Sequence, residues 1–414
     1  MDLLRFITAG SVDDGKSTLI GRLLYDSKSI LVDQLEQLEK HAKNKDAGDI
    51  DLALLTDGLR AEREQGITID VAYRYFSTPK RKFIIADAPG HVQYTRNMIT
   101  GASNANLIII LIDARQGVVE QTRRHSIIAS LLKIPHVVVT VNKMDLVEFS
   151  QDRFNEIVKD YKEVAAQLGL QDVHYFPISA KQGDNIVSKS EATPWYEGPA
   201  LLDFLEEVRV DQDINLETPR FQVQYVLRPQ TETLHDYRGY AGKVISGIYK
   251  KGAKVKVLPA GIETTIEAVE VAGVEKDVVF APQAAVIRLT EDIDISRGDT
   301  IVPVEENPSV ANEMEVTLCW MDEKPLIPGN KYYLQHNSRL VRAVVKNIAY
   351  KIDVNSLQQQ PIDGNVSLNE VVKATLKTAA PLVFDAFDTL RSNGSAILID
   401  ETSNNTVAAV LLQS

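Results

Sequence analysis

The chain has 414 residues, 44% of them hydrophobic and 25% charged, which is ordinary for a globular protein of two to three domains. Its formal net charge of −12 argues against a nucleic-acid carrier, which usually presents a basic surface, although a whole-chain charge leaves room for a local basic patch. The single cysteine, Cys319, excludes internal disulfides and a cysteine-based metal cluster, and it is expected to be a strand residue. So low a cysteine content fits a protein of the reducing cytoplasm.

The first expected element is a strand over residues 3–9, and a chain that enters a core strand so early has no room for a signal peptide. The strand leads into residues 10–17, GSVDDGKS, which match the phosphate-binding pattern G-x-x-x-x-G-K-S/T called the P-loop. Residues 17–24 then have the apolar spacing of a helix. The order strand, loop, helix favours a nucleotide site over the alternative, an ordinary glycine-rich turn before a helix.

The residue types of this loop suit phosphate chemistry. Gly10 and Gly15 let backbone N–H groups turn inward around phosphates, and the N-terminus of the following helix adds a partial positive charge. Lys16 is long enough to reach the β- and γ-phosphates, and the hydroxyl of Ser17 can ligate Mg²⁺. We therefore expect a nucleoside triphosphate with Mg²⁺ at this loop.

A long insert follows, with one expected polar surface helix over residues 33–44. Within residues 60–70, RAEREQGITID, Thr68 is the candidate second hydroxyl ligand of Mg²⁺, on a loop that orders only around an intact γ-phosphate. A lone threonine is more often structural than catalytic, so this assignment depends on the motifs around it.

The next expected strand, residues 82–86, runs into DAPGH. Asp87 stands where a Walker-B carboxylate holds Mg²⁺, usually through a water molecule. The N–H of Gly90 can bond the γ-phosphate, and His91 follows where an attacking water must be positioned, although a lone histidine is also more often structural. Further on, the apolar run 107–112 is too short to span a membrane.

A third motif indicates the base. Residues 142–145, NKMD, directly follow the β-branched run 136–141, which is typical of a buried strand. Guanine presents two donors on one edge and the carboxylate of Asp145 can accept both, whereas adenine lacks this pair and would leave Asp145 unpaired. The motif alone is weak, because a solvated turn after a strand uses the same residues. Its place on a strand end, well downstream of the P-loop, favours guanine.

The expected strand 173–178 precedes Ser179-Ala180-Lys181, a third candidate contact to the base, with an ordinary helix N-cap at Ser179 as the alternative. The order of these motifs along the chain predicts a GTP-hydrolysing switch domain. The predicted nucleotide-binding residues are Gly10, Ser11, Val12, Asp13, Asp14, Gly15, Lys16, Ser17, Thr18, Asp87, Gly90, Asn142, Lys143, Asp145, Ser179, Ala180 and Lys181. The predicted Mg²⁺ ligands are Ser17, Thr68 and Asp87, and the predicted catalytic residues are Lys16, Thr68 and His91.

Strand and helix patterns alternate along residues 1–212, which predicts an α/β P-loop GTPase domain with a parallel sheet and helices on both faces. A helix over 201–208 closes this domain, and the polar residues 211–219 form a linker. Short alternating strands with glycine-rich turns then predict two small β-barrel domains, over 218–306 and 309–414. The expected strands include residues 221–226, 254–258, 267–274, 315–320, 340–345 and 396–400.

A P-loop GTPase domain followed by two β-barrels resembles the translational GTPase superfamily. Within it, the chain is more similar to the GTPase subunits of bacterial sulfate adenylyltransferase (ATP sulfurylase large subunit, CysN). The P-loop and DAPGH indicate the superfamily, while the acidic pair Asp13-Asp14, the run QYTRNM from Gln93 and two runs of the second domain select the family. The second-domain runs are DYRGYAGKVISG from Asp236 and EDIDISRGD from Glu291. The resemblance is strong over residues 3–305 and weak beyond.

Two positions depart from the family pattern: Ala88 is usually threonine, and Val92 is usually glutamate. Neither departure removes a ligand, but Val92 can alter how the switch responds to nucleotide or partner. Some relatives carry a fused C-terminal adenylylsulfate kinase, and the sequence has no second P-loop that would indicate one.

The resemblance implies a division of labour. A separate catalytic subunit joins sulfate to ATP to give adenosine 5′-phosphosulfate and pyrophosphate, and GTP hydrolysis in this chain drives that unfavourable reaction forward through the partner interface. It implies a cytoplasmic heterodimer or larger complex, without nucleic acid or membrane. Two alternatives stay open: a GTP-dependent aminoacyl-tRNA carrier of the elongation-factor type, and a regulatory or assembly GTPase with no metabolic partner.

Overall fold

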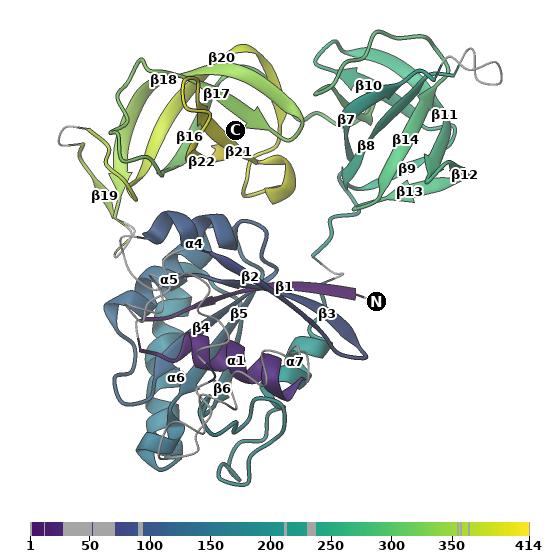
Figure 1. Ribbon diagram of the computed structural model, residues 1–414. Coiled ribbons are helices and arrows are strands. Elements are labelled where there is room, and N and C mark those ends of the chain that lie inside the picture. Colours follow the sequence, from purple (N-terminus) through teal and green to yellow (C-terminus); the bar gives the residue numbers. More distant parts are fainter. Residues whose placement is uncertain are drawn as a thin grey trace. The chain divides into compact units, whose positions relative to one another are not determined.

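The computed structural model describes residues 2–11, 13–27, 52, 71–89, 94–210, 213–229, 237–353, 356, 358–362 and 365–413. The chain divides into two units: one contains residues 1–210 with 354–357, and the other contains residues 211–353 and 358–414. Figure 1 shows the first unit as a sheet with helices and the second as two bodies built of strands.

The first unit is built on a sheet with the strand order β2-β3-β1-β4-β5-β6. Strand β2 runs antiparallel to β3, and the other neighbouring pairs are parallel. The carboxyl ends of the parallel strands therefore meet at one edge, where open α/β sheets bind their ligands. The elements are β1 (Asp2–Ala9), α1 (Lys16–Asp26), β2 (Ala72–Ser77), β3 (Arg81–Asp87), α4 (Thr95–Ala102), β4 (Leu107–Asp113), α5 (Glu120–Leu131), β5 (His136–Asn142), η3 (Met144–Val147), α6 (Gln151–Leu168), β6 (Asp172–Pro177) and α7 (Leu201–Glu207).

Alternation along the buried strands divides their apolar side chains between the two faces of the sheet. Leu4 of β1 belongs to one core cluster with Leu19 and Leu23 of α1, and α7 adds its leucines to the same cluster. Ile7 lies on the opposite face, since a Cβ on Gly101 of α4 would lie 3.2 Å from its Cδ1. Helices thus pack on both faces and fix the loops at the edge of the sheet.

The second unit contains two closed β-barrels. In the first barrel the strand order is β10-β15-β7-β8-β14-β11, and β10 pairs with β11 to close it. Along β7, Phe221 and Val223 belong to the barrel core, while the alternate residues Arg220 and Gln222 lie on the other face. The elements are β7 (Arg220–Leu227), β8 (Gly239–Ser246), β9 (Ile248–Lys250), β10 (Lys254–Leu258), β11 (Ile262–Val271), β12 (Val274–Lys276), β13 (Val278–Phe280), β14 (Ala284–Leu289) and β15 (Thr300–Pro303).

In the second barrel the order is β17-β21-β22-β16-β20-β18, closed by the pairing of β17 with β18. Cys319 lies on β16, as expected, and burial raises the pKa of its thiol to about 12. The elements are β16 (Ser309–Trp320), β17 (Lys331–His336), β18 (Arg339–Ile352), β19 (Gln359–Gln360), β20 (Val371–Phe384), η4 (Arg391–Asn393), β21 (Ser395–Asp400) and β22 (Thr406–Gln413).

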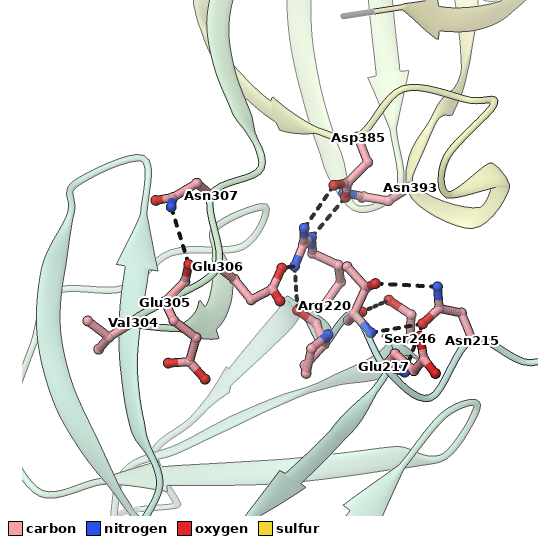
Figure 2. Close-up of polar contacts among 12 residues, drawn as sticks. Asn215, Glu217, Arg220, Ser246, Val304, Glu305, Glu306, Asn307, Asp385 and Asn393 are labelled. Carbon is pink, nitrogen blue, oxygen red and sulfur yellow. Dashed lines mark hydrogen bonds and ion pairs between the residues drawn. The ribbon is translucent and has the colours of Figure 1, made fainter.

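A buried ion pair joins the two barrels (Figure 2). Arg220 of β7 is 2% exposed, and its Nε and Nη2 each lie 2.8 Å from a carboxylate oxygen of Asp385, which follows β20. Its Nη1 donates to Glu306 Oε2 at 2.9 Å. Asn393 of η4 donates to Asp385 Oδ2 at 2.8 Å, so the carboxylate is bonded from both sides.

The structure confirms the predicted fold class, an α/β domain followed by two β-barrels. The strand expected over 267–274 is wrong at both ends, because β11 begins at Ile262 and stops at Val271, and the chain turns at Ala272 and Gly273. The helix expected over 33–44 lies outside the described residues, and the domain boundaries at 212, 218, 306 and 309 stay a prediction. Within the described ranges no helix is long and apolar enough to cross a membrane.

Candidate functional site

The loop between β1 and α1 is shaped by close backbone approaches. Gly15 has a φ of 91°, and a Cβ there would lie 2.5 Å from Nδ2 of Asn142. A Cβ on Gly10 would lie 3.1 Å from Oδ2 of Asp14. Asp13 also has a positive φ, 73°, which is costlier for a residue with a side chain. Only glycine fits at position 15, as the P-loop pattern requires.

Asp14 closes this loop from inside. Its carboxylate accepts the backbone N–H of Ser11 at 2.5 Å, and its own N–H donates to the carbonyl of Ser11 at 3.2 Å. The residue is 3% exposed, and burial raises the pKa of its carboxyl despite the opposing effect of the Ser11 bond. The side chain therefore holds the loop in shape.

Lys16 begins α1 and turns back over the loop. Its Nζ donates to the carbonyl oxygens of Gly10 at 2.8 Å and Ser11 at 3.0 Å. The residue is 7% exposed, and burial lowers the pKa of its ammonium, although Asp87 and the two loop aspartates act in the opposite direction. A triphosphate would offer this buried cation stronger acceptors than two carbonyls.

Asp87 ends β3 beside the loop. Its carboxylate is 2% exposed and accepts the hydroxyl of Thr8 at 3.3 Å, and its charge acts on Lys16. Ser17 and Thr18 are partly buried in the first turn of α1. Carboxylate and hydroxyl oxygens are the hard donors that Mg²⁺ prefers, so the residues present here fit that ion.

Asn142 connects the loops at opposite ends of the site. Its Nδ2 donates to the carbonyl of Asp14 at 2.7 Å, and its Oδ1 accepts the N–H of Ala180 at 2.9 Å. The side chain is 1% exposed. One buried amide thus joins the loop after β1 to the loop after β6 from the end of β5.

Lys143 follows with a φ of 62° and points to a carboxylate that the motifs did not include. Its Nζ lies 3.0 Å from Asp113, which ends β4, and Arg115 contacts the same carboxylate at 2.6 Å and 3.0 Å. Burial alone would raise the pKa of Asp113, but the bonds from Arg115 and Lys143 outweigh it and bring the pKa to about 2. Asp113 is therefore ionised and fixes the position of Lys143.

Asp145 lies half-buried in the first turn of η3, with the positive charge of Arg115 near enough to act on it. Within the described part of the chain, no side chain or backbone group hydrogen-bonds its carboxylate. This arrangement leaves two acceptor oxygens for the donor edge of a base.

Ser179 lies in a tight turn after β6. It is 0% exposed, its Oγ accepts the N–H of Gln182 at 3.2 Å, and Gly183 donates to its carbonyl at 2.7 Å. No helix begins here, so the N-cap alternative is wrong. Arg22 of α1 supports the turn through a bond to the carbonyl of Ala180 at 3.3 Å and another to the carbonyl of Lys181.

The described predicted residues thus gather at the carboxyl ends of β1, β3, β5 and β6. Four others, Val12, Thr68, Gly90 and His91, lie outside the described residues, and their roles stay predictions.

Sequence reasoning missed the side chains that support the site. Arg153 of α6 donates to the carbonyls of Ala114 at 2.7 Å and Arg115 at 3.3 Å, and a Cβ on Gly117 would lie 3.0 Å from its Nη2. Asp113 could have been found, since an acidic residue ending a buried apolar strand is the pattern that identified Asp87. Arg153 carries no such signal, because its contacts join distant segments.

Residues 1–217 match the family described as the elongation factor Tu GTP binding domain, and residues 313–413 match the family described as GTP-eEF1A C-terminal domain-like. Among solved structures, the GTPase-like domain of S. cerevisiae Ski7, bound to GDP and inorganic phosphate, aligns over 99% of this chain and 97% of its own length, with a TM-score of 0.53 and 16% identity. That likeness shows the fold alone.

The chain is 54% identical to sulfate adenylyltransferase subunit 1 of Bacteroides fragilis over 99% of this chain and 86% of the relative. It is 51% identical to the protein of that name from Aliarcobacter butzleri, over 100% and 87% of the two chains. It is 53% identical to the bifunctional enzyme CysN/CysC of Mycobacterium tuberculosis, over 98% of this chain but only 66% of that enzyme. The chain therefore belongs to the sulfate adenylyltransferase subunit 1 (CysN) family, a family of GTPases within the translational GTPase superfamily.

Proposed function

We propose that this chain is the GTP-hydrolysing subunit of a sulfate adenylyltransferase, and that it couples GTP hydrolysis to the synthesis of adenosine 5′-phosphosulfate and pyrophosphate by a separate catalytic subunit. The observation that carries the proposal is the bridge made by Asn142 between Asp14 and Ala180, at 2.7 Å and 2.9 Å. It supports a single guanine nucleotide whose phosphates lie at the β1–α1 loop and whose base lies at the loops after β5 and β6. Membership of the family supports the link to sulfate activation.

In this proposal the phosphates are bound by the backbone N–H groups of the loop and by Lys16. Its Nζ exchanges the carbonyls of Gly10 and Ser11 for β- and γ-phosphate oxygens. Ser17, Thr68 and Asp87 are the residues that would hold Mg²⁺, the last through water. When bound, the ion neutralises phosphate charge and orients the phosphate chain.

The base is selected by hydrogen bonding. Asp145 accepts the two donors of the guanine edge, and Lys143, held by Asp113 at 3.0 Å, borders the same place. The backbone of Ser179, Ala180 and Lys181 completes the contact to the base. An adenine would leave the Asp145 carboxylate without donors, which is the kind of mismatch that discriminates strongly.

Hydrolysis needs a water held in line with the γ-phosphate. We assign that positioning to His91, and we assign contact with the γ-phosphate to the N–H of Gly90. Lys16 stabilises the charge that spreads over the γ-phosphate oxygens as its bond to the leaving oxygen breaks.

Coupling requires two states of this chain that contact the partner differently. Thr68 and the segment after Asp87 are the natural bistable parts, because the γ-phosphate they contact is present in only one state. The chain carries one set of nucleotide motifs, so the chemistry of ATP and sulfate is assigned to the catalytic subunit, in a cytoplasmic heterodimer or larger complex.

Reconstitution tests the proposal. The purified chain alone should bind GTP, hydrolyse it slowly and form no adenosine 5′-phosphosulfate. With the catalytic subunit, ATP and sulfate, GTP should raise the product above the amount reached without GTP. Thr68→Ala should bind the partner yet lose this gain, and His91→Ala should keep GTP binding but slow single-turnover hydrolysis.

The tRNA-carrier alternative makes the opposite prediction. If the chain retains aminoacyl-tRNA on a filter at physiological salt in a GTP-dependent manner, and GTP leaves the yield of adenosine 5′-phosphosulfate unchanged, the proposal is wrong.

A further inference from the structure

The second unit contains a polar cavity of about 400 Å³ where the first barrel meets the hairpin between β17 and β18 of the second. None of its lining residues is acidic, and two are cationic. They are Gln222, Gln224, Lys243, Ile245, Arg297, Asn337 and Ser338.

The two cations come from the two second-domain runs among those that select the family, and the proposed nucleotide site does not use these runs. Lys243 belongs to the run beginning at Asp236 and lies directly opposite Gln222 in the pairing of β7 with β8. Arg297 belongs to the run beginning at Glu291, in the loop before β15, and its Nε donates to the carbonyl of Ser338 at 3.2 Å. Segments about fifty residues apart are thus folded so that both place a positive charge in one cavity.

Other arginines of the second unit pair with carboxylates, whereas these two cations do not. Arg238 pairs with Asp292, Arg288 lies 3.5 Å from Glu267, and Arg339 lies 3.4 Å from Asp299. Among the described residues, neither Lys243 nor Arg297 has a carboxylate within ion-pair distance. The chain has a net charge of −12, yet this cavity holds two cations without a carboxylate partner. The cavity is therefore a local site that can bind a negatively charged group.

The walls of the cavity are bonded to each other. The N–H of Ser338 donates to Oε1 of Gln222 at 3.0 Å, and the Ser338 hydroxyl donates to the carbonyl of Val223 at 2.8 Å. Two residues before Gln222 on β7, Arg220 makes the buried pair with Asp385 (Figure 2). A cavity braced in this way loses little conformational freedom when it binds.

We infer that this cavity receives an acidic segment of a protein partner, with carboxylates placed against Lys243 and Arg297. Both cations are exposed, and an exposed ion pair contributes only about 0.2–1 kcal/mol, so a small free anion gains too little here. Two cations are also few for a nucleic acid, whose binding depends on many phosphate contacts. A polypeptide adds backbone and side-chain bonds to the amides of Gln222, Gln224 and Asn337. Resting on the proposed function, we identify the partner as the catalytic subunit.

The test is a charge reversal in the full-length chain. The Lys243→Glu/Arg297→Glu variant should bind the purified catalytic subunit at least about tenfold more weakly than wild type, because each reversal replaces attraction by repulsion. Wild-type affinity should fall with added salt, and the variant should lose most of that dependence. Lys243→Gln/Arg297→Gln should show a smaller loss. GTP affinity should be unchanged in both variants, and their circular dichroism spectra and unfolding temperatures should match those of wild type, which shows that the barrels are folded.

Lys250→Glu/Lys254→Glu is the matched control, since it makes the same charge change at exposed positions of the same barrel outside the cavity. If the cavity variant binds the partner as well as this control does, the inference is wrong while the proposed function stands. If the wild-type chain does not associate with the catalytic subunit, the proposed function itself fails. Binding of RNA by wild type that the cavity variant loses would overturn the assignment to a protein segment.

Discussion

The choice of base should depend on one carboxylate. Asp145→Asn places an amide donor where xanthine carries its extra carbonyl, so the variant should prefer xanthosine triphosphate and lose GTP affinity by about a hundredfold or more. Asp152→Asn is the control, because Asp152 is an exposed carboxylate in the first turn of α6. Nucleotide titrations in which the Asp145 variant still favours GTP would show that this carboxylate does not bind the base.

His125 of α5 is expected to limit stability in acid. It is 2% exposed, and its Nδ1 has no hydrogen-bond partner among the described residues. Burial, followed by the positive charges of Lys16 and Arg124, lowers the pKa of its imidazole from 6.5 to about 3. Below pH 6.5 the unfolded chain therefore binds a proton that the folded chain does not, and stability is lost as the pH falls.

This histidine alone should remove about 2 kcal/mol of stability by about pH 5. His125→Leu has no proton to gain, so its unfolding temperature should fall less than that of wild type between about pH 7.5 and about pH 5. Thermal unfolding of the nucleotide-free proteins measures this difference. Equal falls would mean that the imidazole is not protected in the folded state.

At the scale of elements, removing the Asn142 side chain that joins two loops should lower both the stability of the chain and its affinity for GTP. Asn142→Ala leaves the carbonyl of Asp14 and the N–H of Ala180 buried without this partner, at a cost of about 1–3 kcal/mol for each group. Because we propose that both loops contact the nucleotide, GTP affinity should fall by about tenfold or more.

Asn185→Ala separates this effect from lost stability. Asn185 is also 1% exposed, and it bonds the carbonyl of Pro177 and the hydroxyl of Thr193, each at 2.8 Å, but it does not reach the P-loop. This variant should unfold more easily yet keep most of its GTP affinity. Similar losses of affinity in both variants would reduce Asn142 to a structural residue.

The elements that sequence reasoning found are those with a continuous local signal. The runs 3–9 and 136–141 became β1 and β5 almost residue for residue, since a strand buried on both faces needs no polar alternation. The end of β11 was missed because the apolar pattern continues to Val274. The break comes from Ala272, whose φ of 51° nothing in its residue type suggests.

The residues of the candidate site also divide into those with a local sequence signal and those without one. Lys16 and Asp145 were located because each motif lies within one short loop. The contacts of Asp113 with Lys143, and of Arg153 with Ala114, depend on which strands become neighbours. That order is a property of the whole sheet, and no window of sequence contains it.

At the scale of the whole molecule, the two barrels should unfold together because of Arg220. Arg220→Ala leaves the Asp385 carboxylate buried with Asn393 as its remaining partner, which should destabilise the second unit by about 3–5 kcal/mol. Calorimetry should then resolve separate transitions for the barrels, and protease should cut sooner within residues 304–308.

The double variant Arg220→Met/Asp385→Leu tests whether the lost stability comes from the unpaired charge of Asp385. Replacing both charges by apolar side chains removes the penalty of an unpaired buried charge, so much of the lost stability should return. Stability no higher than that of Arg220→Ala would mean that the Glu306 contact, rather than the pair with Asp385, carries the effect.

The Arg220–Asp385 pair also constrains how this chain can change over generations. A mutation at either position alone leaves a buried charge without its partner, so single changes should be removed by selection. A change of both positions to apolar residues must pass through one of these destabilised single variants. Across the family, positions 220 and 385 should therefore be inherited as a pair and vary together or not at all, although 165 residues separate them. An alignment in which they vary independently would show that lineages have found another way to hold the barrels together.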